Sequence, residues 1–152
     1  MRVVHYLNQF FGGLGGEEEA GAAPQIKDGA VGPGRLLEQV LGEGAQVVRT
    51  IICGDNYAAE NLDELTELIL CETAEADAEL FVAGPCFEAG RYGVASGAVC
   101  SAVAAELDIP SVTGMALETP AWTCTAKIYS SLTRAKTPRP CVMSWKRWRP
   151  SP

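Results

Sequence analysis

Four residues that can do chemistry lie in one short connection, the segment CFEAGRYG at positions 86–93. Cys86 supplies a thiol, Glu88 a carboxylate, Arg91 a guanidinium and Tyr92 a phenol. An arginine fork binds carboxylates and phosphates, and a helix that begins beside it adds positive potential. The segment therefore predicts an anion-binding site, in which Glu88 either holds a substrate ammonium or pairs with Arg91.

A second loop, NQFFGGLGGEEE at positions 8–19, combines glycines with acidic residues. Gly12, Gly13 and Gly16 would let backbone amides approach a ligand closely. The match to a dinucleotide-binding fingerprint is poor, and acids such as Glu18 would repel a phosphate. A turn followed by a helix N-terminus is the preferred interpretation, because acids there favour the helix dipole.

A third loop, GDNYAAEN at positions 54–61, directly follows an apolar, β-branched run. Asp55 is expected to cap the helix that follows by accepting a backbone N–H bond. Asn56, Tyr57 and Glu60 bring further polar groups to the same place. This loop is therefore a second candidate for contact with a substrate or with another subunit.

The thiols and the single histidine point away from metal chemistry. Six cysteines occur without a C-x-x-C pair, which argues against both a disulfide framework and a zinc site. Cys86 would be reactive if Arg91 lowered the pKa of its thiol, but a buried packing role is preferred. His5 lies inside a predicted strand and is interpreted as a core residue.

The elements that must position these loops alternate along the chain. Strands are predicted at 2–10, 45–54, 79–85 and 109–115, helices at 35–44, 55–78 and 91–108, and glycine-rich turns at 26–34. This alternation is typical of an α/β fold with a mainly parallel sheet and helices on both faces, in Rossmann-like or flavodoxin-like layering. Because parallel strands end at one edge of their sheet, the three loops are expected to meet there.

Composition divides the chain near Ala121. All 19 acidic residues precede Ala121, whereas the stretch from there onward carries seven of the 12 basic residues, all three tryptophans and no glycine. A domain is therefore expected over 1–120 and an atypical, irregular basic tail over 121–152. The acidic body would repel a polyanion, so nucleic acid is not an expected partner. No apolar run approaches the roughly 20 residues of a membrane helix, and no signal peptide is visible, so a cytoplasmic location without membrane insertion is expected.

Several segments together resemble one family. MRVVHYLNQFFGGLGGEEEAG, GAVGPG, VVRTIICGDNYAAEN and the run from Leu80 to Met115 are similar to the N-terminal region of the selenoprotein B subunit of the glycine/sarcosine/betaine reductase family, which has relatives in D-proline reductase. The resemblance extends from Met1 to about Pro120. It implies an amino-acid reductase of anaerobic, amino-acid-fermenting bacteria that deaminates glycine, sarcosine or betaine reductively, leading to acetyl phosphate.

The same resemblance implies partners and cofactors. It implies a selenocysteine nucleophile in this subunit, a pyruvoyl group on a partner subunit, and transfer to selenoprotein A. The family's selenocysteine lies far downstream in a longer chain, so no catalytic residue and no cofactor is assigned to this chain, which is expected to be inactive alone. The candidates for substrate or interface binding are Gly12, Gly13, Gly16, Glu18, Asp55, Asn56, Tyr57, Glu60, Glu88, Arg91 and Tyr92.

Two further hypotheses accompany the one that this chain is part of a reductase subunit. The chain could be a stand-alone α/β module that binds a small anionic ligand through its glycine loops and Arg91. The tail could be read out of frame: if the codons from Pro120 are CCC GCG TGG ACA TGT, restoring one lost G gives Pro-Gly-Val-Asp-Met. The nucleotide sequence of the gene tests that hypothesis.

Overall fold

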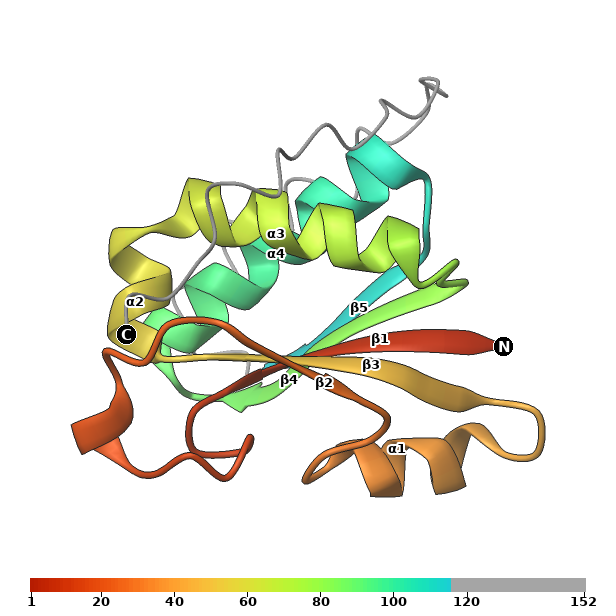
Figure 1. Cartoon of the computed structure of the whole chain (residues 1–152), viewed down its shortest axis with the longest axis horizontal. Coiled ribbons are helices and arrows are strands. Elements are labelled where there is room, and N and C mark those ends of the chain that lie inside the picture. Colours follow the sequence, from red (N-terminus) through yellow and green to blue (C-terminus); the bar gives the residue numbers. More distant parts are fainter. Residues whose placement is uncertain (116–152) are drawn as a thin grey trace.

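Strands and helices alternate in the computed structural model, which describes residues 1–115 (Figure 1). In chain order the elements are β1 (Arg2–Asn8), the 3-10 helix η1 (Glu17–Glu19), β2 (Gln25–Asp28), α1 (Gly34–Leu41), β3 (Gln46–Cys53), α2 (Asp55–Glu60), α3 (Leu62–Glu75), β4 (Leu80–Phe87), α4 (Gly90–Leu107) and β5 (Ser111–Met115). The predicted α/β class is confirmed. The predicted tail at 121–152 lies outside the described residues.

The sheet has five strands in the order β2-β3-β1-β4-β5. Strands β3, β1, β4 and β5 are parallel, and β2 pairs antiparallel with β3. From β1, at the centre of the sheet, the chain passes to β2 and β3 on one side of β1, and then crosses to β4 on the other side of β1. The carboxyl ends of β1 and β4 are therefore the point where the connections diverge, which is where open α/β sheets bind ligands.

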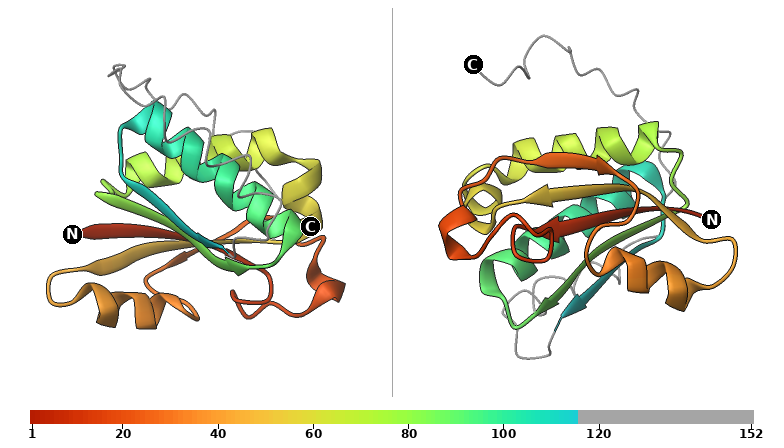
Figure 2. Two further views of the ribbon diagram at one scale, coloured as in Figure 1. Left: turned by 180° about the vertical axis from the view of Figure 1, so that it is seen from behind. Right: turned by 60° about the horizontal axis from the view of Figure 1, so that its bottom comes forward.

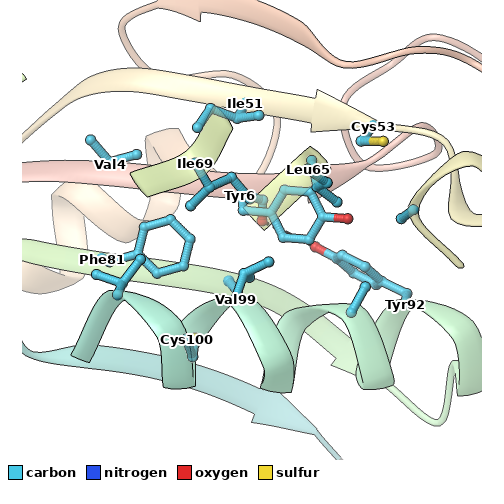
Figure 3. Packing of buried hydrophobic residues seen from close by; sticks show 14 of the residues in the cluster. Val4, Tyr6, Ile51, Cys53, Leu65, Ile69, Phe81, Tyr92, Val99 and Cys100 are labelled. Atoms are coloured by element: carbon cyan, nitrogen blue, oxygen red, sulfur yellow. Dashed lines mark hydrogen bonds between the residues drawn. The ribbon is translucent and has the colours of Figure 1, made fainter. Parts of the chain in front are cut away.

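Helices lie on both faces of this sheet, as expected (Figures 1 and 2). On one face, α2, α3 and α4 pack against the sheet, and on the other face α1 lies over β3 and β1. The main core fills the space between the sheet and α3 and α4 (Figure 3). Tyr6, Leu65, Phe81 and Val99 are fully buried there. Burial of such large apolar side chains holds the strands, and therefore the loops at their ends, in place.

The predicted elements are wrong at two places, where a strand was missed and where one helix is in fact two. The stretch 26–34 was predicted to be turns only, but Gln25–Asp28 forms β2, whose Ile26 pairs with Ile51. The single helix predicted at 55–78 is two helices, because Asn61 leaves the helical region with φ −127° and ψ 41°. The Asn61 side chain donates to the carbonyl of Tyr57 over 3.1 Å and so stabilises the break.

Residues 1–115 contain neither a membrane-spanning helix nor a cluster of metal-binding side chains. No helix there is both long and apolar enough to cross a bilayer. No cluster of three histidine, cysteine, aspartate or glutamate side chains in that range is arranged to hold a metal ion.

Candidate functional site at the carboxyl edge of the sheet

Arg91 joins the three polar loops. It lies in the first turn of α4, and its Nη1 donates to Oδ1 of Asn56 over 2.7 Å. Its Nη2 donates to Oε1 of Glu17 over 2.5 Å, and the pair is also a salt bridge. The loops that follow β1, β3 and β4 therefore meet at one guanidinium. We call these loops, residues 9–22, 54–61 and 88–91, the loop rim.

Glu17, rather than Glu88, is the carboxylate that holds Arg91. Glu88 is exposed, and no ion pair between the described residues joins it to Arg91. The Arg91 and Glu17 side chains are 47% and 71% exposed, so solvent screens their attraction. An anion arriving from solution could therefore compete with Glu17 for the guanidinium.

Asp55 is a buried residue of the rim. The sequence predicted that its side chain would cap α2, and this prediction is wrong. Gly54 is the N-cap residue, and no side-chain cap bond forms. The Asp55 Oδ2 atom instead accepts from Nδ2 of Asn8 over 3.2 Å, and its backbone amide donates to Oε1 of Gln9 over 3.0 Å. Burial raises the pKa of the Asp55 carboxyl, and the hydrogen bonds from Asn8 and Gln9 oppose that rise. The Oδ1 atom has no partner among the described residues.

A backbone carbonyl occupies the N-terminus of α2. The oxygen of Ala20 accepts from the amides of Asn56 over 2.8 Å and Tyr57 over 3.2 Å. The amide of Gly54 donates to the oxygen of Ala22 over 2.9 Å. These amides are the ones that would bind an anion at a helix N-terminus. Their bonds to the first loop disfavour an anion site there and leave Arg91 as the cationic group of the rim.

The predicted glycines serve three different purposes. A Cβ on Gly12 would lie 2.2 Å from Cγ2 of Ile52, so Gly12 lets the loop lie directly on β3. Gly13 has φ +73°, a conformation that favours glycine. The amide of Gly16 donates to Oε1 of Glu18 over 2.8 Å, and this bond lowers the pKa of the Glu18 carboxyl. The glycines therefore shape the loop, and their amides do not form a phosphate cradle.

The remaining candidates differ in how they are exposed. Tyr92 is fully buried, and its hydroxyl donates to the carbonyl of Tyr6 over 3.2 Å, which places it in the core below the rim. Tyr57 is partly buried, and burial raises the pKa of its phenol. Glu60 is exposed and lines a shallow surface hollow formed by residues 59–64. Tyr57 and Glu60 can meet a partner at the surface, whereas Tyr92 supports the rim from inside.

Sequence reasoning missed an aromatic cluster in which Phe11 contacts Phe10, Phe87 and Tyr92. The Phe11 ring lies 5.4 Å from that of Phe10 and 5.9 Å from that of Phe87, measured between ring centroids. Phe10 is 65% exposed and Phe87 is 62% exposed. The two adjacent phenylalanines before the glycine loop were the available signal. Exposed aromatic rings favour binding of a cation or of a protein surface.

The thiol of Cys86, in the segment at positions 86–93, is not positioned to react. Cys86 is 1% exposed, and its sulfur lies 3.5 Å from the Thr113 hydroxyl. Burial raises the pKa of the Cys86 thiol, the opposite of what a reactive cysteine needs. Cys53, Cys71 and Cys100 are buried as well. The packing role that the sequence analysis preferred for Cys86 agrees with the structure, and Cys124 and Cys141 lie outside the described residues.

Comparisons with known proteins agree with the resemblance seen in the sequence. A family model described as glycine/sarcosine/betaine reductase selenoprotein B matches residues 1–139. The glycine reductase complex component B subunit gamma of Symbiobacterium thermophilum is 54% identical over 120 residues, which are 79% of this chain and 28% of that protein. The sarcosine reductase complex component B subunit beta of Peptoclostridium acidaminophilum is 53% identical over 120 residues, with the same two shares.

A third relative is named for a different amino acid, betaine. The betaine reductase complex component B subunit beta of Peptoclostridium acidaminophilum is 45% identical over 119 residues, which are 78% of this chain and 27% of that protein. The chain therefore spans less than a third of the length of these curated relatives. No solved structure matches the chain significantly.

Proposed function

Because this chain belongs to the glycine/sarcosine/betaine reductase selenoprotein B family, we propose that it forms part of a component B subunit and that its loop rim faces the amino-acid substrate. The observation that carries this proposal is the convergence of all three loops on Arg91. The carboxyl ends of β1 and β4, where this happens, are the usual ligand position in an open α/β sheet.

The relatives' names suggest what Arg91 would recognise. They name glycine, sarcosine and betaine reductases, with 45% to 54% identity to this chain. These three amino acids share an acetate carboxylate and differ only in the methyl groups on nitrogen. A rim shared by the three kinds of reductase would therefore bind the carboxylate, and an arginine guanidinium suits that group. On binding, Arg91 would exchange the carboxylate of Glu17 for that of the substrate.

The acidic residues of the rim have a complementary role in this proposal. Once released from Arg91, Glu17 carries an unpaired negative charge beside the substrate. Together with Glu18 it would attract the positively charged nitrogen that all three amino acids carry. Phe10, in the same first loop, is 65% exposed, and an exposed aromatic face suits methylated ammonium groups.

The bond cleavage itself is assigned outside the described residues. We propose that it requires the selenocysteine of the remaining subunit, a pyruvoyl-bearing partner subunit and selenoprotein A, leading to acetyl phosphate. The residues described here would bind and orient the substrate, and a cytoplasmic site of action is part of the proposal. This chain alone is expected to form no acetyl phosphate from glycine, sarcosine or betaine.

A grafted subunit tests the role of Arg91. Residues 1–115 of this chain replace the matched segment of the Symbiobacterium thermophilum subunit, and the complete complex is assayed for amine-dependent acetyl phosphate. Arg91→Ala is expected to raise KM for the amino acid roughly 10- to 100-fold, because a hydrogen bond to a charged group is worth about 1.5–3 kcal/mol. Arg35→Ala, in α1, is the matched control and is expected to leave KM unchanged.

The graft separates three outcomes. An active graft whose KM responds to Arg91→Ala but not to Arg35→Ala supports the proposal. An active graft that is indifferent to Arg91→Ala overturns the role of the rim. If Arg91→Ala instead prevents assembly of the complex, as seen by size-exclusion chromatography, the rim binds a subunit and not the substrate.

A further inference from the structure

Exposure rises steadily across the sheet face on which α1 lies. Thr50, His5, Val82 and Val112 are register partners on β3, β1, β4 and β5, and so form one row across that face. Thr50 and His5 are buried, Val82 is partly buried, and Val112 is 51% exposed. The row beside it shows the same trend, because Val3 on β1 is buried and its partner Leu80 on β4 is only partly buried.

The position of α1 explains this gradient. Among residues 1–115, α1 is the helix on this face, and it packs against β3, with Gly34 placed beside the ring of His5 (Figure 2). It does not extend over β4 and β5. On the opposite face α4 covers the same two strands, and Phe81 and Ala83 of β4 are fully buried. Residues 1–115 therefore cover both faces of the sheet at β3 and β1, but only one face at β4 and β5.

Parallel strands are normally covered on both faces by the helices of their own fold. We infer that the apolar half-face formed by Leu80, Val82 and Val112 binds a segment of the component B subunit that lies outside the part matched here. The relatives supply the length for this, since the match covers only 28% of the Symbiobacterium thermophilum subunit. The inference rests on family membership and does not depend on what the rim binds.

The right-handedness of crossovers between parallel strands limits which segment of the subunit can cover the half-face. A right-handed crossover that continues beyond β5 places its helix on the same face as α4. A helix that covers Val82 and Val112 must therefore come from chain that has turned back across the sheet. We assign the half-face to such a returning helix, which would lie beside α1 and complete that layer. Its contact residues would be apolar, because the half-face offers two valines and a leucine.

Thiol labelling of Val112→Cys tests this assignment. The labelling rate is measured by peptide mass spectrometry in this chain alone and in the full-length graft described above. We expect a rate at least about tenfold slower in the graft, because a covered residue reacts only when the covering segment opens. Val40→Cys, on the 75% exposed position of α1, is the control and should react equally in both proteins.

Every other pattern overturns the assignment. Equal rates for Val112→Cys in both proteins mean that the remainder of the subunit does not cover the half-face. Protection in the chain alone that grows with concentration means that a second copy binds there. Protection of the graft only after the other subunits are added assigns the face to a partner subunit. None of these readings requires activity, so they stay separate from the test of Arg91.

Discussion

The carbonyl oxygen of Ala20 lies 2.2 Å from the position that a Cβ atom on Gly54 would take. The carbonyl carbon of Ala20 and the amide nitrogen of Ala22 would each lie 2.6 Å from the same atom. Three backbone atoms of the first loop thus lie directly on residue 54. This contact allows the first loop to cap α2 and to bring Glu17 within reach of Arg91.

Gly54→Ala is therefore expected to lower the free energy of unfolding by about 3 kcal/mol, because the added methyl group meets backbone that cannot rotate away. Urea unfolding followed by circular dichroism measures the change. Gly21→Ala is the matched control, since a Cβ there meets nothing within 4 Å, and it should change stability by less than about 0.5 kcal/mol. Equal effects of the two variants would contradict the close contact.

The two buried tyrosines should respond oppositely to loss of the hydroxyl. The Tyr92 hydroxyl donates to the carbonyl of Tyr6, whereas the Tyr6 hydroxyl has no partner among the described residues. Tyr92→Phe should cost about 1 kcal/mol of stability, and Tyr6→Phe should be neutral or stabilising. Their rings pack edge to face 5.7 Å apart, and both variants keep that contact (Figure 3). A larger loss for Tyr6→Phe than for Tyr92→Phe would show that the Tyr6 hydroxyl has a partner.

His5 should make the protein less stable in acid. Its Nε2 donates to the carbonyl of Gly84 over 2.7 Å, and burial lowers the pKa of the ring from 6.5. Because the folded pKa lies below the unfolded value, stability is full above pH 6.5 and is lost as the pH falls through the folded pKa. NMR titration of this single histidine should give a pKa below 6.5.

A variant isolates that effect from other titrations. His5→Gln retains a side-chain N–H donor for the Gly84 carbonyl but does not titrate between pH 5 and 7. Its free energy of unfolding, measured in urea at several pH values, should fall less over that range than the wild-type value. An identical slope in both proteins would assign the acid sensitivity to other groups.

The Arg91–Glu17 pair should contribute little to stability. Both side chains are substantially exposed, so a double-mutant cycle with alanine should give a coupling below about 1 kcal/mol that weakens with salt. Arg49 and Glu72 provide the comparison, because their side chains are only 22% and 15% exposed. Their coupling should be the larger of the two. A stronger coupling at Arg91 would mean that its bonds hold the fold together.

Much of the architecture was visible in residue patterns. The β-branched run at 45–54 and the small-residue run at 91–108 predicted β3 and α4, and the parallel order then predicted that three loops would share an edge. Strand β2 was missed because its four residues are mostly exposed and polar, so only antiparallel pairing with β3 defines it. The break at Asn61 was missed because residues 55–60 contain no proline or glycine that would mark the end of a helix, so they read as one segment with the leucine pattern that begins at Leu62.

The details of the rim were harder to predict, for physical reasons. The Ala20 carbonyl caps α2, and a backbone carbonyl has no signature in the sequence. Glu17 and Glu88 are equally plausible partners for Arg91 by residue type, and only the path of the first loop selects Glu17. The contact of Phe11 with Phe87 likewise depends on a turn that brings residues 76 positions apart together.

The Arg91–Glu17 bond also fixes when the rim can exist during protein synthesis. These two residues are 74 positions apart, and β1, which is made first, pairs with β3 and β4 on its two sides. A nascent chain that has reached only α3 has both acidic loops but no guanidinium between them. Because contacts that close such long separations form late, we expect the rim to assemble only after the start of α4 has left the ribosome.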